Sequence, residues 1–289
     1  MNEALLPALK RLYVWDKLPE YFAGGHAWSD GTLFKFEAGG STKLLKVMPA
    51  GGERSLESVS ERQAFTEYLF RNGIDTVLPL HSVAGNLAEA FIHEGKSYIA
   101  YSWEMVPGSH TELGDPRNCT AFYTRWGSLL GKMHRLAKAW PDWQFSASRD
   151  TKGPLISRAK EWEHFYRWIP DPEVKEAWLK LRSELDALPQ TRENFGFIHN
   201  DAHPGNILSA GERLILIDFD VSNYLWFMVD IAICIYSEYS RVKFHSPWGK
   251  RSPELDQIFV QPFMQAYESE NKLPAGEYFQ RVEAARGEL

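Results

Sequence analysis

The chain has 289 residues, of which 44% are hydrophobic and 14% aromatic, and its formal net charge is -6. This apolar content is enough for a sizeable packed core, so we expect little disorder. The mild negative charge contains no long run of one sign. It therefore argues against a nucleic-acid-coating protein and against a polybasic membrane-surface protein.

The sequence contains no segment that we interpret as a membrane or secretion signal. Its start lacks a basic patch followed by an apolar core and a cleavage site. The longest apolar run, Tyr224 to Tyr236, is too short for a membrane span and contains Asp230. Cys119 and Cys234 have no metal-binding spacing and fit reduced thiols. We therefore expect a cytoplasmic protein that contacts neither membrane nor nucleic acid.

The first third of the chain has the pattern of strands joined by glycine turns, interrupted by one helix. Strand-like alternation begins after position 21 and continues at Thr32 to Glu37 and at Lys43 to Met48. A helix is predicted at about Val59 to Arg71, and Asn72-Gly73 ends it. Two more strands are predicted at 87–92 and 97–103. The pattern indicates an antiparallel sheet with one helix.

After Val106-Pro107-Gly108 the pattern becomes mainly helical, which predicts a lobe boundary between residues 105 and 106. Asp115-Pro116 and Asp171-Pro172 are each typical of a helix start. Short strands return between Phe195 and Phe219, and helices resume from Asp230. We expect an N-terminal lobe over 1–105 and a C-terminal lobe over 106–289, with the chemistry in the strand-rich part of the latter.

The most informative segment fits the pattern His-x-Asp-x-x-x-x-Asn, with His199, Asp201 and Asn206 at its fixed positions. A second apolar strand then ends at Asp218, as in the kinase signature set. Asp201 would orient an attacking hydroxyl, and Asn206 would direct a side-chain oxygen to a metal ion. A hairpin turn near 210–212 would bring Asp218 beside Asn206, and two oxygen ligands suit Mg²⁺.

This segment resembles the catalytic region of aminoglycoside phosphotransferases and their relatives, including choline, homoserine and fructosamine kinases. The resemblance rests on His203-Pro204-Gly205-Asn206, Asp218-Phe219-Asp220 and Asp230-Ile231-Ala232. It implies an α+β fold with two lobes of the protein-kinase type. It also implies that Asp201 is the catalytic base, that Asn206 and Asp218 are the metal ligands, and that His199 and Asp230 support the loop.

A kinase needs a cation on the nucleotide phosphates, and a strand lysine usually supplies it. Lys46 is our candidate because it lies among apolar residues in the last strand before the helix. Lys43 is three residues away and therefore points to the other face of that strand. Glu61 is the expected partner of Lys46 because it shares the apolar helix face, whereas Glu67 does not.

Two further nucleotide contacts are expected from the family resemblance. Gly24-Gly25 resembles the loop that covers the phosphates, where backbone N–H groups approach phosphate oxygens. The adenine would bond to backbone groups of Glu104 and Val106 between the lobes. ATP or GTP, together with Mg²⁺, is the cofactor that these residues imply.

Four alternatives compete with a small-molecule kinase. A haloacid-dehalogenase-type phosphatase would use Asp218 as nucleophile and Asp220 as acid, but it needs a further parallel sheet. A zinc hydrolase would use His199, Asp201 and His203, although Pro204-Gly205 favours a loop over the required strand. A Ser/Thr protein kinase or an inactive nucleotide-binding relative would share the fold.

We therefore predict transfer of the γ-phosphate of ATP or GTP to a hydroxyl group of a small molecule, either an antibiotic or a metabolite. Aromatic residues are dense between the lobe boundary and the catalytic segment and again just after it. They would either line an amphipathic pocket or pack helices together. These residues are Trp162, Phe165, Tyr166, Trp168, Trp226 and Phe227.

Overall fold

The structure is a computed structural model of the chain, and it describes residues 5–24, 31–51, 55–141, 162–163, 166–167, 169–242 and 253–274. These residues form two compact units, which we describe one at a time. The first unit comprises the described residues of Met1–His110 and Gly205–Val221. The second comprises those of Thr111–Gly153, Ser157–Pro204 and Ser222–Leu289. The lobe boundary between residues 105 and 106 stays a prediction.

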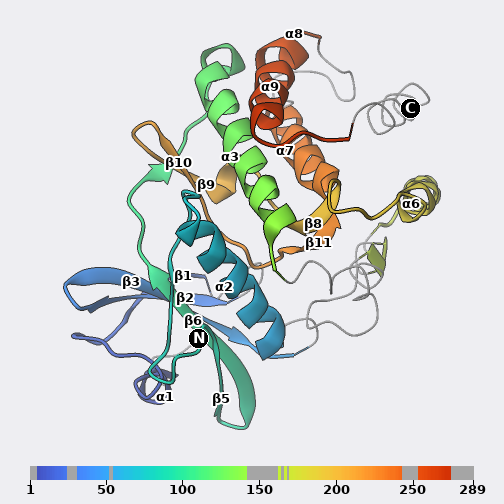
Figure 1. Cartoon of the computed structure of the whole chain (residues 1–289). Helices are drawn as coiled ribbons and strands as arrows, with labels where there is room; N and C mark the ends of the chain where they lie inside the picture. Colours follow the sequence, from blue (N-terminus) through green and yellow to red (C-terminus); the bar gives the residue numbers. More distant parts are fainter. Residues whose placement is uncertain are drawn as a thin grey trace. The chain divides into compact units, whose positions relative to one another are not determined.

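A six-stranded sheet forms the body of the first unit, and all its pairings are antiparallel. The strands run in the order β1-β2-β3-β6-β4, and β5 also pairs with β6 (Figure 1). Their bounds are β1 Glu20–Gly24, β2 Thr32–Ala38, β3 Ser41–Pro49, β4 Pro79–Leu80, β5 Glu89–His93 and β6 Lys96–Glu104.

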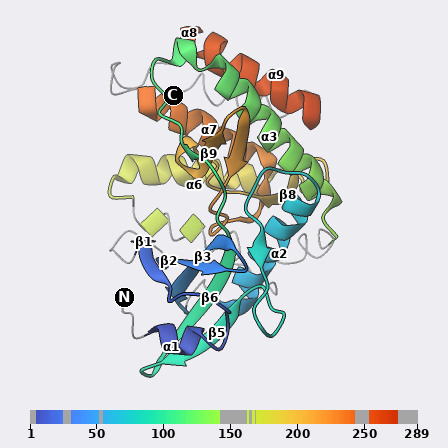
Figure 2. The same ribbon diagram turned by 90° about the vertical axis from the view of Figure 1, so that its left-hand side faces the viewer.

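The two faces of this sheet bury different helices. On one face Phe34, Leu45 and Val47 pack with Leu6 and Leu9 of α1 (Leu6–Leu9). On the other face, Met48 and Tyr101 pack with Val59 of α2 (Leu56–Arg71), which runs beside the sheet in Figures 1 and 2. Because successive strand residues alternate between faces, Lys46 lies on the α2 side.

Helix α2 begins three residues before the predicted Val59. Ser55 is its N-cap, and the Ser55 side chain accepts a hydrogen bond from the Ser58 backbone N–H at 3.1 Å. This bond satisfies one of the N–H groups that the first turn leaves without a helical partner. The predicted end of the helix at Arg71 agrees with the structure, where Asn72 is the C-cap.

A second, smaller sheet completes the first unit. Strands β9 (Ile207–Ala210) and β10 (Arg213–Leu216) form a hairpin, and β7 (Ser109–His110) pairs with β9. The turn contains Gly211 with φ of 64°, a conformation that glycine adopts without strain. Thr76 Oγ1 donates to the Leu216 carbonyl at 2.7 Å, and Leu216 N–H donates to the Asp75 carbonyl at 2.9 Å. These bonds attach the hairpin to the N-terminal part of the chain.

The second unit is mainly helical. Its longer helices are α3 Thr120–Ala139, α6 Pro172–Asp186, α7 Phe227–Val242 and α9 Gln261–Glu270. It also contains short helical turns, which are η2 Pro116–Asn118, α8 Pro253–Leu255 and the π-helical η5 Asp256–Val260. A two-stranded sheet pairs β8 Phe195–Ile198 with β11 Asn223–Trp226. Asp171 is the N-cap of α6, as predicted. The helix start predicted at Asp115-Pro116 is instead the start of the 3-10 turn η2, and α3 begins at Thr120.

Helices α3 and α9 lie side by side in both Figure 1 and Figure 2. Two glycines of α3 make this approach possible. A Cβ atom on Gly127 would lie 2.0 Å from the Phe263 carbonyl oxygen, and one on Gly131 would lie 2.6 Å from the Tyr267 carbonyl oxygen. Real Cβ atoms do not come this close to backbone, so the contact requires glycine at both positions.

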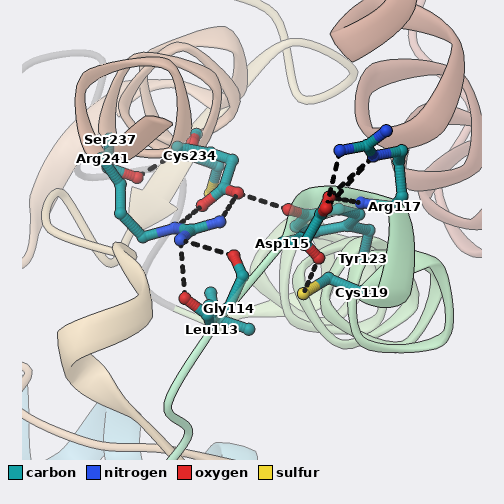
Figure 3. Close-up of polar contacts among 10 residues, drawn as sticks. Leu113, Gly114, Asp115, Arg117, Cys119, Tyr123, Cys234, Ser237 and Arg241 are labelled. Atoms are coloured by element: carbon teal, nitrogen blue, oxygen red, sulfur yellow. Dashed lines mark hydrogen bonds and ion pairs between the residues drawn. The ribbon is translucent and has the colours of Figure 1, made fainter. Parts of the chain in front are cut away.

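A buried charge network holds the start of the second unit (Figure 3). Glu238 of α7 is fully buried, and its carboxylate accepts hydrogen bonds from the Tyr123 hydroxyl and from Arg241 Nε at 2.7 Å. Arg241 Nη1 also donates to the carbonyl oxygens of Leu113 at 2.6 Å and Gly114 at 3.1 Å. The network ties α3 and α7 to the segment before η2.

The antiparallel sheets and the helices together confirm the predicted α+β class. The haloacid-dehalogenase alternative requires a further parallel sheet after Asp218. The strand that follows Asp218 in the described part of the chain, β11, pairs antiparallel with β8. No helix in the described ranges is long and apolar enough to cross a bilayer.

Candidate active site

In the second unit, Asp230 at the start of α7 holds the loop that follows β8. Its Oδ2 accepts the His199 backbone N–H at 2.8 Å, and its Oδ1 accepts the Asn200 backbone N–H at 2.6 Å. Asn200 has φ of 65°, which is uncommon for a residue with a side chain. The Ser222 hydroxyl donates to the His199 carbonyl at 3.2 Å. A residue of α7 and the residue just before β11 therefore fix the loop.

His199 is fully buried, whereas Asp201 two residues later is exposed over 44% of its side chain. His199 Nδ1 accepts the Asp201 backbone N–H at 3.3 Å, which sets the direction of the chain at Asp201. His203 Nε2 lies 3.5 Å from Asp201 Oδ2. The imidazole of His199 is therefore enclosed, whereas the carboxylate of Asp201 is partly accessible, and the roles of both residues stay predictions.

The zinc alternative gains no support from this loop. Within the parts of the chain that the structure describes, no group of three or more His, Cys, Asp or Glu side chains is arranged to hold a metal ion. His199, Asp201 and His203 all lie within these parts of the chain.

Asp230 has a third partner that the sequence did not reveal. His134 of α3 is fully buried, and its Nε2 lies 3.0 Å from Asp230 Oδ2. His134 Nδ1 lies 2.8 Å from the Tyr267 hydroxyl, which also accepts a hydrogen bond from Asn271 Nδ2 at 2.8 Å. A histidine within the apolar face of a helix was the available signal, because a buried polar group needs a partner.

The two predicted metal ligands lie close together in the first unit. Asn206 is the last residue of the 3-10 turn η3 (Pro204–Asn206), and its backbone carbonyl accepts the Ile217 N–H at 2.9 Å. Asp218, the next residue after Ile217, has φ of 66° and a side chain that is 49% exposed. The hairpin thus brings the backbone of Asn206 next to that of Ile217 and Asp218. Amide and carboxylate oxygens are ligands that suit Mg²⁺.

Lys46 lies beside the same carboxylate. Lys46 Nζ is 4.0 Å from Asp218 Oδ1 and forms a closer ion pair with Asp220 Oδ2. Burial acts to raise the pKa of Asp220, but the Lys46 ammonium and the Tyr101 hydroxyl together hold it below its usual value. Burial and the charge of Asp220 raise the pKa of Tyr101. Asp220 and Tyr101 were not among the predicted site residues.

Lys43 is engaged elsewhere, as its place on the other strand face predicts. Its Nζ lies 2.7 Å from Glu104 Oε1. Glu61 is a half-buried residue of α2, on the side of the sheet that also bears Lys46. Its pairing with Lys46 stays a prediction.

The remaining predicted nucleotide residues are partly described. Gly24 is the last residue of β1 and has φ of 81°. A Cβ atom on Gly24 would lie 2.3 Å from the Gly31 carbonyl oxygen. Gly25 lies outside the described residues. The backbone N–H of Glu104 donates to the Leu78 carbonyl at 3.0 Å. A contact between this backbone and a base stays a prediction. Val106 is half-buried just beyond β6.

The aromatic residues near the catalytic loop are at least partly a packing cluster. Trp162 and Trp226 are buried and stack with their ring centroids 6.2 Å apart, and Trp178 meets Trp162 edge to face at 5.8 Å. Phe195 packs against Trp226 at 5.3 Å. Phe165 and Trp168 lie outside the described residues. These contacts favour helix packing over a pocket lining for Trp162 and Trp226.

Residues 26–273 match the phosphotransferase enzyme family. One curated relative, the amicoumacin kinase of Bacillus subtilis (strain 168), is 28% identical over 230 residues, which cover 76% of this chain and 63% of the relative. The chain thus spans less than two thirds of that relative's length.

Solved structures share the fold. An amicoumacin kinase, hAmiN, in complex with AMP-PNP, Ca²⁺ and Ami has a TM-score of 0.74 and 21% identity, with 94% of this chain and 79% of that chain covered. A microcompartment-associated aminopropanol kinase has a TM-score of 0.62 and 17% identity, with 93% and 81% covered. These similarities confirm the predicted kinase-like fold.

Proposed function

Because the chain belongs to the phosphotransferase enzyme family, we propose that it transfers the γ-phosphate of ATP or GTP to a hydroxyl group of a small molecule. The observation that carries this proposal is the grouping of Lys46, Asn206 and Asp218 in the first unit. These are the residue types that phosphoryl transfer requires: a cation for the phosphates and oxygen ligands for a metal ion.

Asn206 and Asp218 are the residues that would hold Mg²⁺, and the bound ion would offset phosphate charge. The accessible carboxylate of Asp218 and the neighbouring amide of Asn206 fit this ion, which seldom has an all-protein cage. Lys46 would bind the phosphates as a second positive charge. The other nucleotide contacts would come from Gly24, the Glu104 carbonyl and the Val106 N–H. Gly25 is a further predicted contact.

Asp201 orients the acceptor hydroxyl and takes its proton as the oxygen attacks the γ-phosphorus in line. The bond from that phosphorus to the bridging oxygen breaks, and ADP or GDP leaves. No covalent enzyme intermediate is required. Asp230 and His134 keep the loop in place, so Asp201 approaches the acceptor without a further rearrangement.

The acceptor class follows from the relatives, whose names refer to amicoumacin and aminopropanol. We propose a small acceptor alcohol, either an antibiotic or a metabolite. We also propose that the protein works in the cytoplasm, where ATP is available. Its two cysteines are free and buried, and burial raises the pKa of both thiols, which suits a reducing compartment.

The test is a coupled ADP-release screen with Mg²⁺ and ATP or GTP. The acceptors are amicoumacin, aminopropanol, aminoglycosides, macrolides, choline, ethanolamine, homoserine, amino sugars and fructosamines. We expect one acceptor class to increase ADP release and to be recovered as its phosphate ester. The control is Asp201→Asn, which should abolish turnover and leave nucleotide affinity within about twofold, because it removes only the base.

Two other results would reject the proposal. If no acceptor of the panel increased ADP release, and Mg²⁺ and ATP caused no thermal shift, the protein would be an inactive relative of these kinases. Phosphate incorporation into casein with no small acceptor used would indicate the Ser/Thr protein kinase. Unchanged turnover in Asp201→Asn would remove Asp201 from the role of base.

A further inference from the structure

Two of the carboxylates near the Lys46 ammonium differ in exposure. Asp218 lies 4.0 Å away and is 49% exposed, whereas Asp220 is in direct contact and only 13% exposed. The Lys46 side chain is itself 12% exposed. An ion pair is stronger where water is excluded, so Asp220 rather than Asp218 fixes the position of the ammonium.

Both oxygens of the Asp220 carboxylate are engaged. Lys46 contacts Oδ2, and the hydroxyl of Tyr101 donates to Oδ1. Tyr101 is buried in β6 directly opposite Lys46 in β3, so the two side chains project from the same face of the sheet. Asp220 is therefore largely enclosed and contacts Lys46 and Tyr101 at the same time, whereas the Asp218 carboxylate is half-exposed.

A second cation belongs to this group. Arg62 of α2 is 7% exposed, and its positive charge acts on both Asp220 and Tyr101. The sheet and the segment after β10 therefore meet through Asp220.

We propose that Asp220, oriented by Tyr101 and faced by Arg62, is the positioning residue that sets the Lys46 ammonium for the nucleotide phosphates. This inference rests on the proposed function and refines its nucleotide site. It makes Asp220 a counter-ion of Lys46 in addition to Glu61, whose pairing with Lys46 stays a prediction. Asp220 acts through Lys46 and touches no reacting atom.

The test measures nucleotide affinity directly, which requires no known acceptor. ATP displaces a fluorescent ATP analogue in the presence of Mg²⁺, and thermal unfolding is recorded for each variant. We expect Asp220→Asn to weaken ATP affinity about 10-fold, because a charge-assisted bond is replaced by a neutral one. Tyr101→Phe should weaken it about threefold, because Lys46 keeps its partner and only the orientation of the carboxylate is lost.

Matched controls come from the same unit. Tyr98→Phe changes a tyrosine of the same strand that stacks on Phe91 instead. Asp75→Asn removes a carboxylate that pairs with Arg213 at the surface. Both controls should leave ATP affinity within about twofold of wild type. Wild-type protein that binds no nucleotide would reject the proposed function itself and not this refinement.

Two results would overturn the inference while the proposed function stood. If Asp220→Asn and Tyr101→Phe lowered thermal stability but bound ATP as wild type does, Asp220 would have only a structural role. If raising Mg²⁺ restored the affinity of Asp220→Asn, Asp220 would be a metal ligand. If Glu61→Gln weakened ATP affinity and Asp220→Asn did not, Glu61 and not Asp220 would be the counter-ion of Lys46.

Discussion

His134 is a titratable residue that is fully buried. It stacks on the Phe227 ring at 4.6 Å and lies between Asp230 and the Tyr267 hydroxyl. Burial lowers the pKa of His134 although Asp230 acts in the opposite direction, and Lys138 adds to the lowering. The imidazole is therefore neutral at pH 7, and it holds Asp230 through hydrogen bonding rather than through a full ion pair.

This environment predicts a pH dependence of stability. The unfolded histidine has a pKa of about 6.5, so below that value the unfolded chain binds a proton that the folded chain binds less readily. The contribution of His134 to the free energy of unfolding is complete above about pH 6.5. It is lost as the pH falls, by at most about 1.4 kcal/mol per pH unit. Urea unfolding between pH 8 and 5 should show a steeper loss for wild type than for His134→Gln. Equal slopes would contradict this account.

At the scale of single residues, the spacing along one segment singled out His199, Asp201, Asn206 and Asp218, because that spacing has a chemical reason. Their roles stay predictions. Residues that meet only through the fold were missed. Tyr101 and Asp220 are separated by more than a hundred positions, and a lone tyrosine in a strand has no chemical pattern of its own.

At the scale of elements, the contact of α3 with α9 depends on the two glycines of α3. Glycine lowers helix propensity by about 1 kcal/mol relative to alanine, so without the contact Gly127→Ala would stabilise α3. Because the added Cβ would meet backbone at 2.0 Å, we expect instead a net loss of about 1–3 kcal/mol in the free energy of unfolding.

The measurement is chemical denaturation of Gly127→Ala beside Gly114→Ala. A Cβ atom on Gly114 would meet nothing within 4 Å, so this control should stay within about 1 kcal/mol of wild type. Equal stability of the two variants would show that α9 lies farther from α3 than the structure has it.

Elements with a clear hydrophobic period and a clear terminating residue could be predicted from the sequence, and short elements could not. The strands at 32–37 and 43–48 and the helix ending at Arg71 were found within a few residues. Strand β11 was missed because Asn223–Trp226 continues directly into α7, and a continuous apolar run does not distinguish strand from helix.

At the scale of the whole molecule, the sequence predicted two lobes of different composition. It did not reveal that Gly205–Val221 belongs to the first compact unit. That assignment depends on pairing of the hairpin with β7 and with Thr76, far away in sequence. Periodicity within a segment contains no information about such partners.

This division has a consequence for function. Asn206, Asp218 and Asp220 are in the same unit as Lys46, whereas Asp201 and His199 are in the other unit. The chain passes from one unit to the other between Pro204 and Gly205, within the predicted catalytic segment. The residues proposed to bind the metal ion and the phosphates therefore lie in one compact unit, and the proposed base lies in the other.

The most direct test is a crystal structure of the protein with Mg²⁺ and AMP-PNP. We predict Asn206 Oδ1 and an Asp218 oxygen at about 2.1 Å from the metal ion. Lys46 Nζ should lie at about 3 Å from a phosphate oxygen, and the Asp201 carboxylate should face the γ-phosphate. A nucleotide bound with none of these four side chains on its phosphates or its metal ion would contradict the assignment of this chain as a phosphotransferase.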